Sequence, residues 1–149
     1  MKNIFNPFHA REVLDRIDRL SPSSKPQWGE MDVAKMLAHC SAFQDIAMGD
    51  VSPKRSWSGI LIGRFAKLMF YNDKPLARNM STVSAIKIVD ERNFEVEKEK
   101  LKLQIIPFQK KGAQECMGRP HPFFGKLTSE QWGKGIYKHI DHHLKQFGV

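Results

Sequence analysis

Three histidines are the residues in this sequence whose types and spacing best suit metal chemistry. His139 and His143 lie four residues apart in GIYKHIDHHLKQF, and His39 lies far upstream in KMLAHCSAF. Residues four apart share one face of an α-helix, with about 5–6 Å between their Cβ atoms, so two such imidazoles can bind one ion. Three protein ligands leave a divalent ion with open positions, which is typical of a catalytic metal site. Imidazole suits zinc, nickel, copper and iron alike, so the ligands do not select the metal.

A fourth histidine, His121, lies in GRPHPFFGKL, shortly before the predicted last helix. Two flanking prolines favour an extended backbone there, and the N-terminus of the following helix offers free N–H groups and partial positive charge. Two interpretations are open. His121 is either a catalytic acid, base or substrate-orienting residue near the metal, or a loop residue that packs or caps. His9 and His142 are predicted to be surface residues.

The histidines also admit an interpretation without metal, because a single histidine on an apolar helix face is more often a hydrogen-bonded core residue than a ligand. Two hypotheses from different classes follow. In the first, the protein is a metal-dependent enzyme in which the ion lowers the pKa of a bound water or thiol, for hydrolysis or thiol transfer. In the second, it is a non-catalytic helical bundle that acts as a binding or stress-response module with vestigial histidines.

The last helix carries the clearest local signals. Thr128 is followed three residues later by Gln131, a pattern typical of a capping box. Leu127 and Trp132 flank the cap as a hydrophobic staple, and Gly148 is predicted to end the helix. Its inward face is predicted from apolar residues three or four apart, namely Trp132, Ile136, Ile140, Leu144 and Phe147. His143 falls within this stripe and His139 at its edge.

Periodicity and caps predict the remaining elements. The predicted helices run from His9 to Leu20, from the N-cap Asp32 to Gly49, from Ser58 to Tyr71, and from the N-cap Asp90 to a kink or end at Pro107. His39 lies at the edge of the buried face of the second helix. An irregular stretch is expected through Pro75–Val89, where STVSAIKIV is the one β-leaning run. The predicted fold class is therefore all-α, with long connecting loops.

The segment SGILIGRFAKLMFY is apolar almost all round, which favours either deep burial or an oligomer contact such as a homodimer. Arg64 and Lys67 interrupt it, and it is too short to span a bilayer. Since the N-terminal segment also lacks an apolar signal sequence, we expect a soluble, cytoplasmic protein with no membrane partner. Cys40 and Cys116 have no short spacing, so both are expected to be reduced and to form neither a disulfide framework nor a zinc knuckle.

Composition indicates one ordinary globular domain over residues 1–149, with 41% hydrophobic and 27% charged residues. The formal net charge of +8 admits nucleic-acid binding as a third hypothesis. However, basic residues are scattered along the chain with acids between them, and no helix-turn-helix pattern accompanies them, so a nucleic-acid partner is not expected. A glycine-rich phosphate loop, a GxSxG elbow and CxxC pairs are all missing, which argues against P-loop NTPases, α/β-hydrolases and thioredoxins.

Two segments, QWGEMDVAKMLAHCSAF and HPFFGKLTSEQWGKGIYKHIDHHLKQFGV, resemble the DinB-like (YfiT-related) superfamily of metal-dependent enzymes, in an uncharacterised bacterial branch. The resemblance implies a four-helix bundle with up-down-down-up connectivity, often dimeric, with His39, His139 and His143 as ligands. It also implies nickel, zinc or iron, and a small-molecule substrate such as the low-molecular-weight thiols bacillithiol, mycothiol or glutathione. Where many relatives have Arg-Gly-Gln after the last histidine, this chain has Leu144-Lys145-Gln146, a departure among the residues expected to bind substrate.

Overall fold

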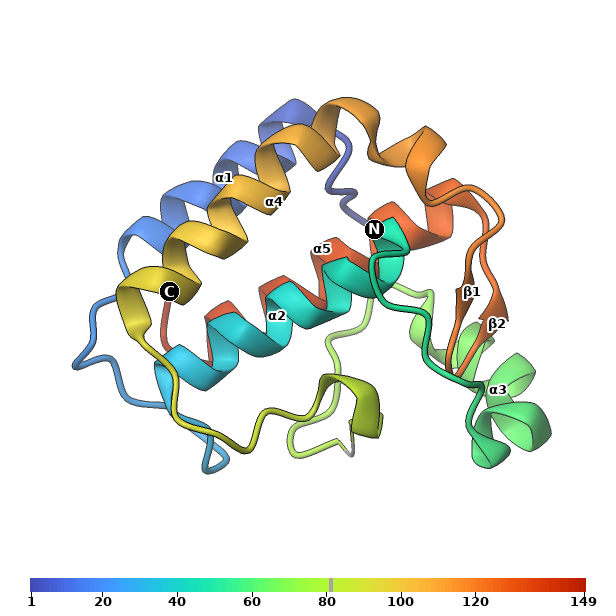
Figure 1. Cartoon of the computed structure of the whole chain (residues 1–149), viewed down its shortest axis with the longest axis horizontal. Helices are drawn as coiled ribbons and strands as arrows, with labels where there is room; N and C mark the ends of the chain where they lie inside the picture. Colours follow the sequence, from blue (N-terminus) through green and yellow to red (C-terminus); the bar gives the residue numbers. More distant parts are fainter. Residues whose placement is uncertain (81) are drawn as a thin grey trace.

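The structure is a computed structural model that describes residues 1–80 and 82–149 (Figure 1). Over these residues the chain is mostly helical, with five α-helices, one short 3₁₀ helix and a two-stranded antiparallel ribbon. The elements are α1 (Pro7–Asp18), α2 (Val33–Met48), α3 (Trp57–Phe70), η1 (Ser84–Ile86), α4 (Phe94–Glu115), β1 (Pro120–His121), β2 (Gly125–Lys126) and α5 (Ser129–Gln146). The predicted helical class is confirmed, whereas a four-helix bundle with up-down-down-up connectivity is not.

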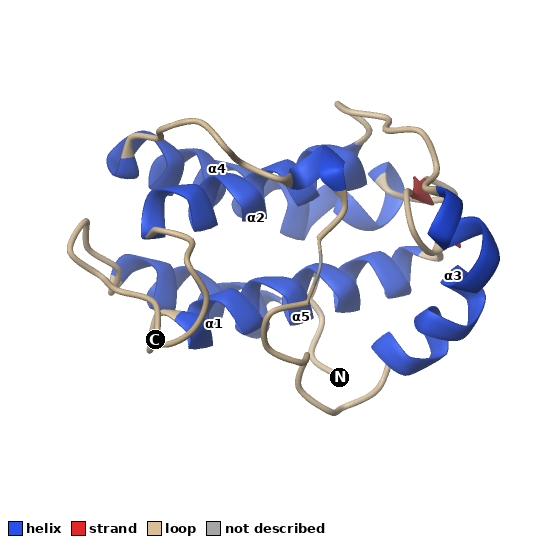
Figure 2. Cartoon of the chain, turned by 90° about the horizontal axis from the view of Figure 1, so that it is seen from below, coloured by secondary structure: helices blue, strands red, loops and turns tan. Residues whose placement is uncertain are grey.

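One hydrophobic core lies between α1, α2, α4 and α5. Figure 1 shows α2 alongside α5 and α1 alongside α4, while Figure 2 shows α2 with α4 on one side of the core and α1 with α5 on the other. Each of these four helices contacts at least two of the others. Its largest fully buried side chains include Ile17, Leu37, Phe108, Trp132 and Ile136. Full burial of one such side chain stabilises the fold by about 1.5–3 kcal/mol. This core fixes α2 against α5, the two helices that carry the three candidate ligands.

The predicted ends of α5 and α2 are confirmed. The Thr128 hydroxyl accepts a hydrogen bond from the Gln131 backbone N–H (3.1 Å), and the Gln131 side chain accepts one from the Thr128 N–H (3.0 Å). Asp32 caps α2 by accepting a hydrogen bond from the Lys35 N–H (2.8 Å). Gly49 ends α2 with φ 84°, a left-handed conformation that glycine adopts readily.

Two other helix boundaries differ from the prediction. α1 begins at Pro7, two residues before His9, because the Asn6 side chain accepts a hydrogen bond from the Phe8 N–H (2.9 Å). At α4 the cap is Asn93, which accepts from the Val96 N–H, while Asp90 pairs with Arg92.

Pro107 does not end α4, which continues to Glu115. Of the two predicted alternatives, a kink or an end, the end is therefore wrong. A proline inside a helix costs about 3 kcal/mol because one hydrogen bond is lost and its ring crowds the preceding turn. Here Ile105 and Phe108, on either side of it, are fully buried in the core, and their packing offsets this cost. Local sequence signals could not reveal that compensation.

The short strands of the structure do not lie where the sequence suggested. The β-leaning run STVSAIKIV forms no strand over residues 82–89; it contains η1, and Ser81 lies outside the described residues. The strands instead lie in the loop before α5, where Pro120 pairs with Lys126 and His121 with Gly125. Cys116 is buried at the end of α4, and Cys40 and Cys116 are both free.

The sequence left open whether the apolar third helix, α3, is deeply buried or forms an oligomer contact. Deep burial is wrong. α3 stands at one end of the molecule (Figure 1), where it contacts the ribbon, and Gly59 and Gly63 are its buried residues. A Cβ atom at either glycine would collide with the backbone oxygen of Phe123, so these glycines allow α3 to lie against the ribbon. Among the described residues, no helix combines the length and apolar character needed to cross a lipid bilayer.

Candidate metal centre

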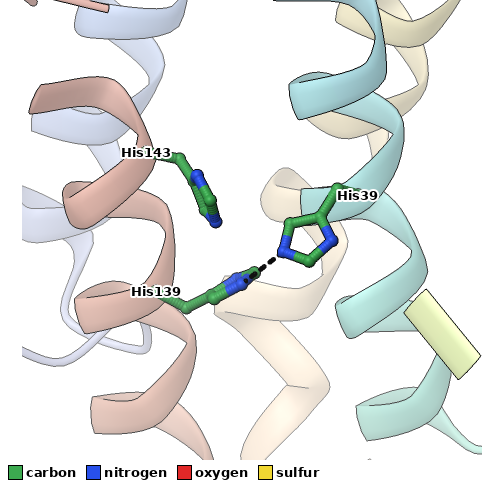
Figure 3. Close-up of side chains that lie close together, drawn as sticks. All are labelled: His39, His139 and His143. Atoms are coloured by element: carbon green, nitrogen blue, oxygen red, sulfur yellow. Dashed lines mark hydrogen bonds between the residues drawn. The ribbon is translucent and has the colours of Figure 1, made fainter. Parts of the chain in front are cut away.

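The structure brings the three histidines from α2 and α5 together (Figure 3). Each pair of their ring centroids is 4.8 Å apart, and one ring nitrogen from each residue lies within 4.8 Å of the other two. The two closest, Nε2 of His39 and Nε2 of His139, are 2.9 Å apart. Among the described residues, the cluster contains no carboxylate or thiolate ligand.

The ring of His39 is oriented by the short helix η1. Its Nδ1 lies 2.7 Å from the backbone oxygen of Ile86. Because a carbonyl oxygen only accepts hydrogen bonds, Nδ1 must carry the ring proton and donate it to Ile86. The other nitrogen, Nε2, then presents its lone pair toward the two histidines of α5.

A chain of two hydrogen bonds orients the ring of His143. Its Nδ1 lies 2.8 Å from the side-chain oxygen of Gln146, whose amide nitrogen donates to the backbone oxygen of Trp28 (2.7 Å). Since Trp28 holds the amide nitrogen, the Gln146 oxygen faces His143 and accepts the Nδ1 proton. Nε2 of His143 is therefore also left with a lone pair. An outer hydrogen bond of this kind, which fixes tautomer and ring orientation, is the usual companion of a metal-bound histidine.

Sequence reasoning missed Gln146, Ile86 and Trp28 as members of this site. A signal for Gln146 existed, because it follows His143 by three residues and so lies on the same face of the helix. No local pattern could place Ile86 or Trp28, because their backbone oxygens come from η1 and from the segment before α2, both distant in sequence from the histidines of α5.

His139 completes the cluster differently. Its Nδ1 is a buried nitrogen without a hydrogen-bond partner among the described residues, and its ring packs on Phe43 with centroids 4.6 Å apart. His139 is half-buried, whereas His39 and His143 are buried.

The donor set fits a divalent transition-metal ion. With metal–nitrogen bonds of about 2.0–2.1 Å, two ligands are roughly 2.9 Å apart at right angles and roughly 3.4 Å apart in a tetrahedral arrangement. The separation of 2.9 Å between Nε2 of His39 and Nε2 of His139 falls at the lower of these values. The upper limit of 4.8 Å within the cluster exceeds both, so rings would turn slightly inward around an ion.

Burial keeps these histidines uncharged. Desolvation lowers the pKa of His143 to about 3, with a further contribution from nearby His39. Desolvation also lowers the pKa of His39, against a smaller opposing effect of its hydrogen bond to Ile86. The pKa of His139 lies well below its ordinary value because of burial and the neighbouring histidines. All three are therefore neutral near pH 7, the form in which histidine binds metal.

His121 lies outside this group of three. Its ring nitrogen Nδ1 accepts hydrogen bonds from the backbone N–H groups of Phe123 (3.0 Å) and Phe124 (3.1 Å), and so helps to close the turn of the ribbon. The ring is buried, it stacks on Phe124, and burial lowers its pKa to about 4. These contacts match the interpretation of a residue that packs and caps, and a catalytic role for His121 stays a prediction.

The two remaining histidines are less exposed than the sequence suggested. His9 is half-buried beside Asn3, and half-buried His142 packs beside the Trp28 ring with centroids 5.7 Å apart. Neither belongs to the cluster of three. His142 is therefore a natural control position, since it adjoins His143 on the same helix.

Comparison with known proteins corrects the assignment to the DinB-like superfamily. That resemblance is wrong: nothing indicates membership of that superfamily, and a model of a different family matches nearly the whole chain. It rested on short segments around paired histidines, a spacing that any helix uses to place two imidazoles on one face. No curated protein and no solved structure matches the chain. Because the matching model covers residues 7–148, the chain belongs to the family described as "Protein of unknown function (DUF1569)".

Proposed function

We propose that this protein is a metal-dependent enzyme in which His39, His139 and His143 hold one divalent transition-metal ion. The observation that carries this proposal is the pair of outer hydrogen bonds, from His39 to Ile86 and from His143 to Gln146. Each bond directs the Nε2 lone pair of its histidine toward the same buried space. Nickel, zinc and iron all accept such a donor set.

Three ligands from two helices leave coordination positions for a small molecule. An ion held there would act as a Lewis acid that lowers the pKa of a bound water or thiol, which serves either hydrolysis or transfer of a low-molecular-weight thiol. The protein's own part is to hold three neutral imidazoles in place and to keep water from most of the site.

The second candidate function is that of a non-catalytic binding or stress-response module. One observation favours it: without an ion, His139 can donate its Nε2 proton to the Nε2 lone pair of His39, across 2.9 Å. This hydrogen bond holds the two rings together by itself. In that case the three histidines would stabilise the fold and would have no catalytic or metal-binding role.

Activity of the stripped and reloaded protein distinguishes the two candidates. The chain is freed of metal with a chelator, reloaded separately with zinc, nickel or ferrous iron, and assayed with ester substrates and with glutathione or bacillithiol plus a chromogenic electrophile. We expect turnover that requires one of the ions, is lost in His39→Ala and persists in His142→Ala. A folded protein that takes up no ion and turns over no substrate would support the module instead.

A further inference from the structure

α3 presents its large apolar side chains to solvent. The exposed fractions are 81% for Trp57, 72% for Leu61, 73% for Phe65, 76% for Leu68 and 77% for Met69. At about 100° per residue these five side chains fall within an arc of roughly 120°, on the face opposite Gly59 and Gly63. The glycine face contacts the ribbon, and the apolar face is exposed to solvent. α3 lies at the end of the molecule (Figure 2).

A basic groove accompanies this apolar face. It has a volume of about 750 Å³ and lies between α3 and β2, with Phe65, Leu68 and Phe124 among its lining residues. Four cationic side chains also line it, namely Arg55, Arg64, Lys67 and Lys126. No acidic residue lines it within the part of the chain that the structure describes, and the sequence from 51 to 72 contains none.

The cations of the groove are not neutralised within the protein. Arg55 donates to the backbone oxygen of Gly59 (3.1 Å) and Lys67 to that of Lys126 (2.8 Å). Among the described residues, none of the four cations forms a salt bridge with a carboxylate. An occupant of this surface must therefore supply both apolar groups and negative charge.

An anionic membrane surface satisfies both requirements. Helices that lie in a membrane interface combine an apolar face rich in tryptophan, phenylalanine and leucine with lysine and arginine beside it, and anionic headgroups attract such basic clusters. A second copy of the chain, the occupant suggested by the sequence, fits less well. A symmetric contact through this face would bring two sets of like charges together.

We propose that α3 and the groove beside β2 bind the surface of anionic phospholipid membranes. The apolar face of α3 enters the boundary between headgroups and acyl chains, with Trp57 at the level of the headgroups. Arg55, Arg64, Lys67 and Lys126 contact the lipid phosphates. The helix lies along the membrane, and the metal centre stays in the body of the protein outside it.

Vesicle sedimentation of the full-length protein tests this proposal. Vesicles of phosphatidylcholine alone are compared with vesicles in which roughly one-third of the lipid is phosphatidylglycerol. We expect binding to the anionic vesicles only, weakened by salt because screening reduces the attraction. Fluorescence should shift to the blue on binding, since Trp57 leaves water, and this shift should disappear in Trp57→Phe.

Paired variants identify the surface. Arg64→Glu combined with Lys67→Glu should weaken vesicle binding at least about tenfold, and Phe65→Ser with Leu68→Ser should also weaken it. The matched control reverses two exposed cations in the segment between α1 and α2, Arg19→Glu with Lys25→Glu, and should bind like the unmodified protein. Figure 1 shows that segment at the end of the molecule opposite α3. Circular dichroism checks that each variant retains its helices.

Three outcomes would overturn the proposal. One is failure of the unmodified protein to bind anionic vesicles. Another is vesicle binding that neither of the two paired α3 variants weakens. Vesicle binding that the control pair weakens as strongly as the α3 variants do would count in the same way. A third is a dimer in analytical ultracentrifugation that Phe65→Ser with Leu68→Ser dissociates, in the absence of vesicle binding, which would assign this face to a second copy.

Discussion

We expect zinc or nickel to raise the melting temperature of this protein, and we expect His143→Ala to abolish that rise. A ligand that binds only the folded state raises the free energy of unfolding by about 2.7 kcal/mol at a concentration one hundred times its Kd. His143 is buried, and its ring is held by Gln146, so its removal deletes one of three ligands from a fixed site. Calorimetric melts of the stripped protein, with and without each ion, measure the effect.

Two further variants make this experiment specific. His142→Ala alters the neighbouring residue outside the cluster and should retain the full metal-dependent shift. Gln146→Ala keeps all three ligands but removes the acceptor for the His143 Nδ1 proton, so metal affinity should fall about 10–100-fold. If His143→Ala lowers the melting temperature equally with and without ions, His143 serves the core and not a metal site.

Acidification from pH 7 to pH 5 is expected to destabilise the metal-free protein by several kcal/mol. The pKa of His143 is lowered to about 3 and that of His121 to about 4 in the folded state, against about 6.5 in the unfolded chain. The unfolded state therefore binds more protons below pH 6.5, and the stability present above that pH is lost as the pH falls. At pH 5 each of these two residues accounts for a loss of about 2 kcal/mol.

Urea unfolding in the presence of a chelator, at pH 7 and at pH 5, measures this loss. His121→Asn removes one contributor, so the difference in unfolding free energy between the two pH values should shrink by about 2 kcal/mol. Ile105→Val, a purely apolar truncation in the core, should lower stability by the same amount at both pH values. A His121→Asn protein with the full pH dependence would contradict the view that buried His121 remains uncharged.

The parts of the fold that the sequence predicted well depend on contacts between near neighbours. Thr128 and Gln131 satisfy each other's backbone groups within one helical turn, and Asp32 caps α2 in the same way. The relation of His139 to His143 is equally local, because the helix itself sets their spacing. Patterns of this kind can be recognised in a single sequence, because the interactions that stabilise them involve only a few neighbouring residues.

The parts that could not be predicted depend on tertiary contacts. α4 passes through Pro107 because Ile105 and Phe108 pack in a core built by other helices. The apolar pattern of α3 is the same for a buried helix as for one that presents its apolar face outward; the two glycines against Phe123 decide between them.

The hydrogen bonds that orient the candidate ligands could not be predicted from the sequence for a similar reason. The backbone oxygen of Ile86 orients His39 directly, and that of Trp28 orients His143 through Gln146. Every residue has a backbone carbonyl, so the sequence does not show which of them will accept such a hydrogen bond. The family assignment erred in the same direction. A motif of a few histidines indicates that the residues share one face of a helix, but it does not identify the family to which the whole chain belongs.

Anomalous X-ray diffraction from crystals grown with the bound metal, recorded above and below its absorption edge, tests the proposed metal centre most directly. We expect one strong peak between α2 and α5, about 2.0–2.3 Å from a ring nitrogen of each of His39, His139 and His143. Continuous density for a direct hydrogen bond between His39 and His139, with no anomalous peak at the cluster, would contradict it.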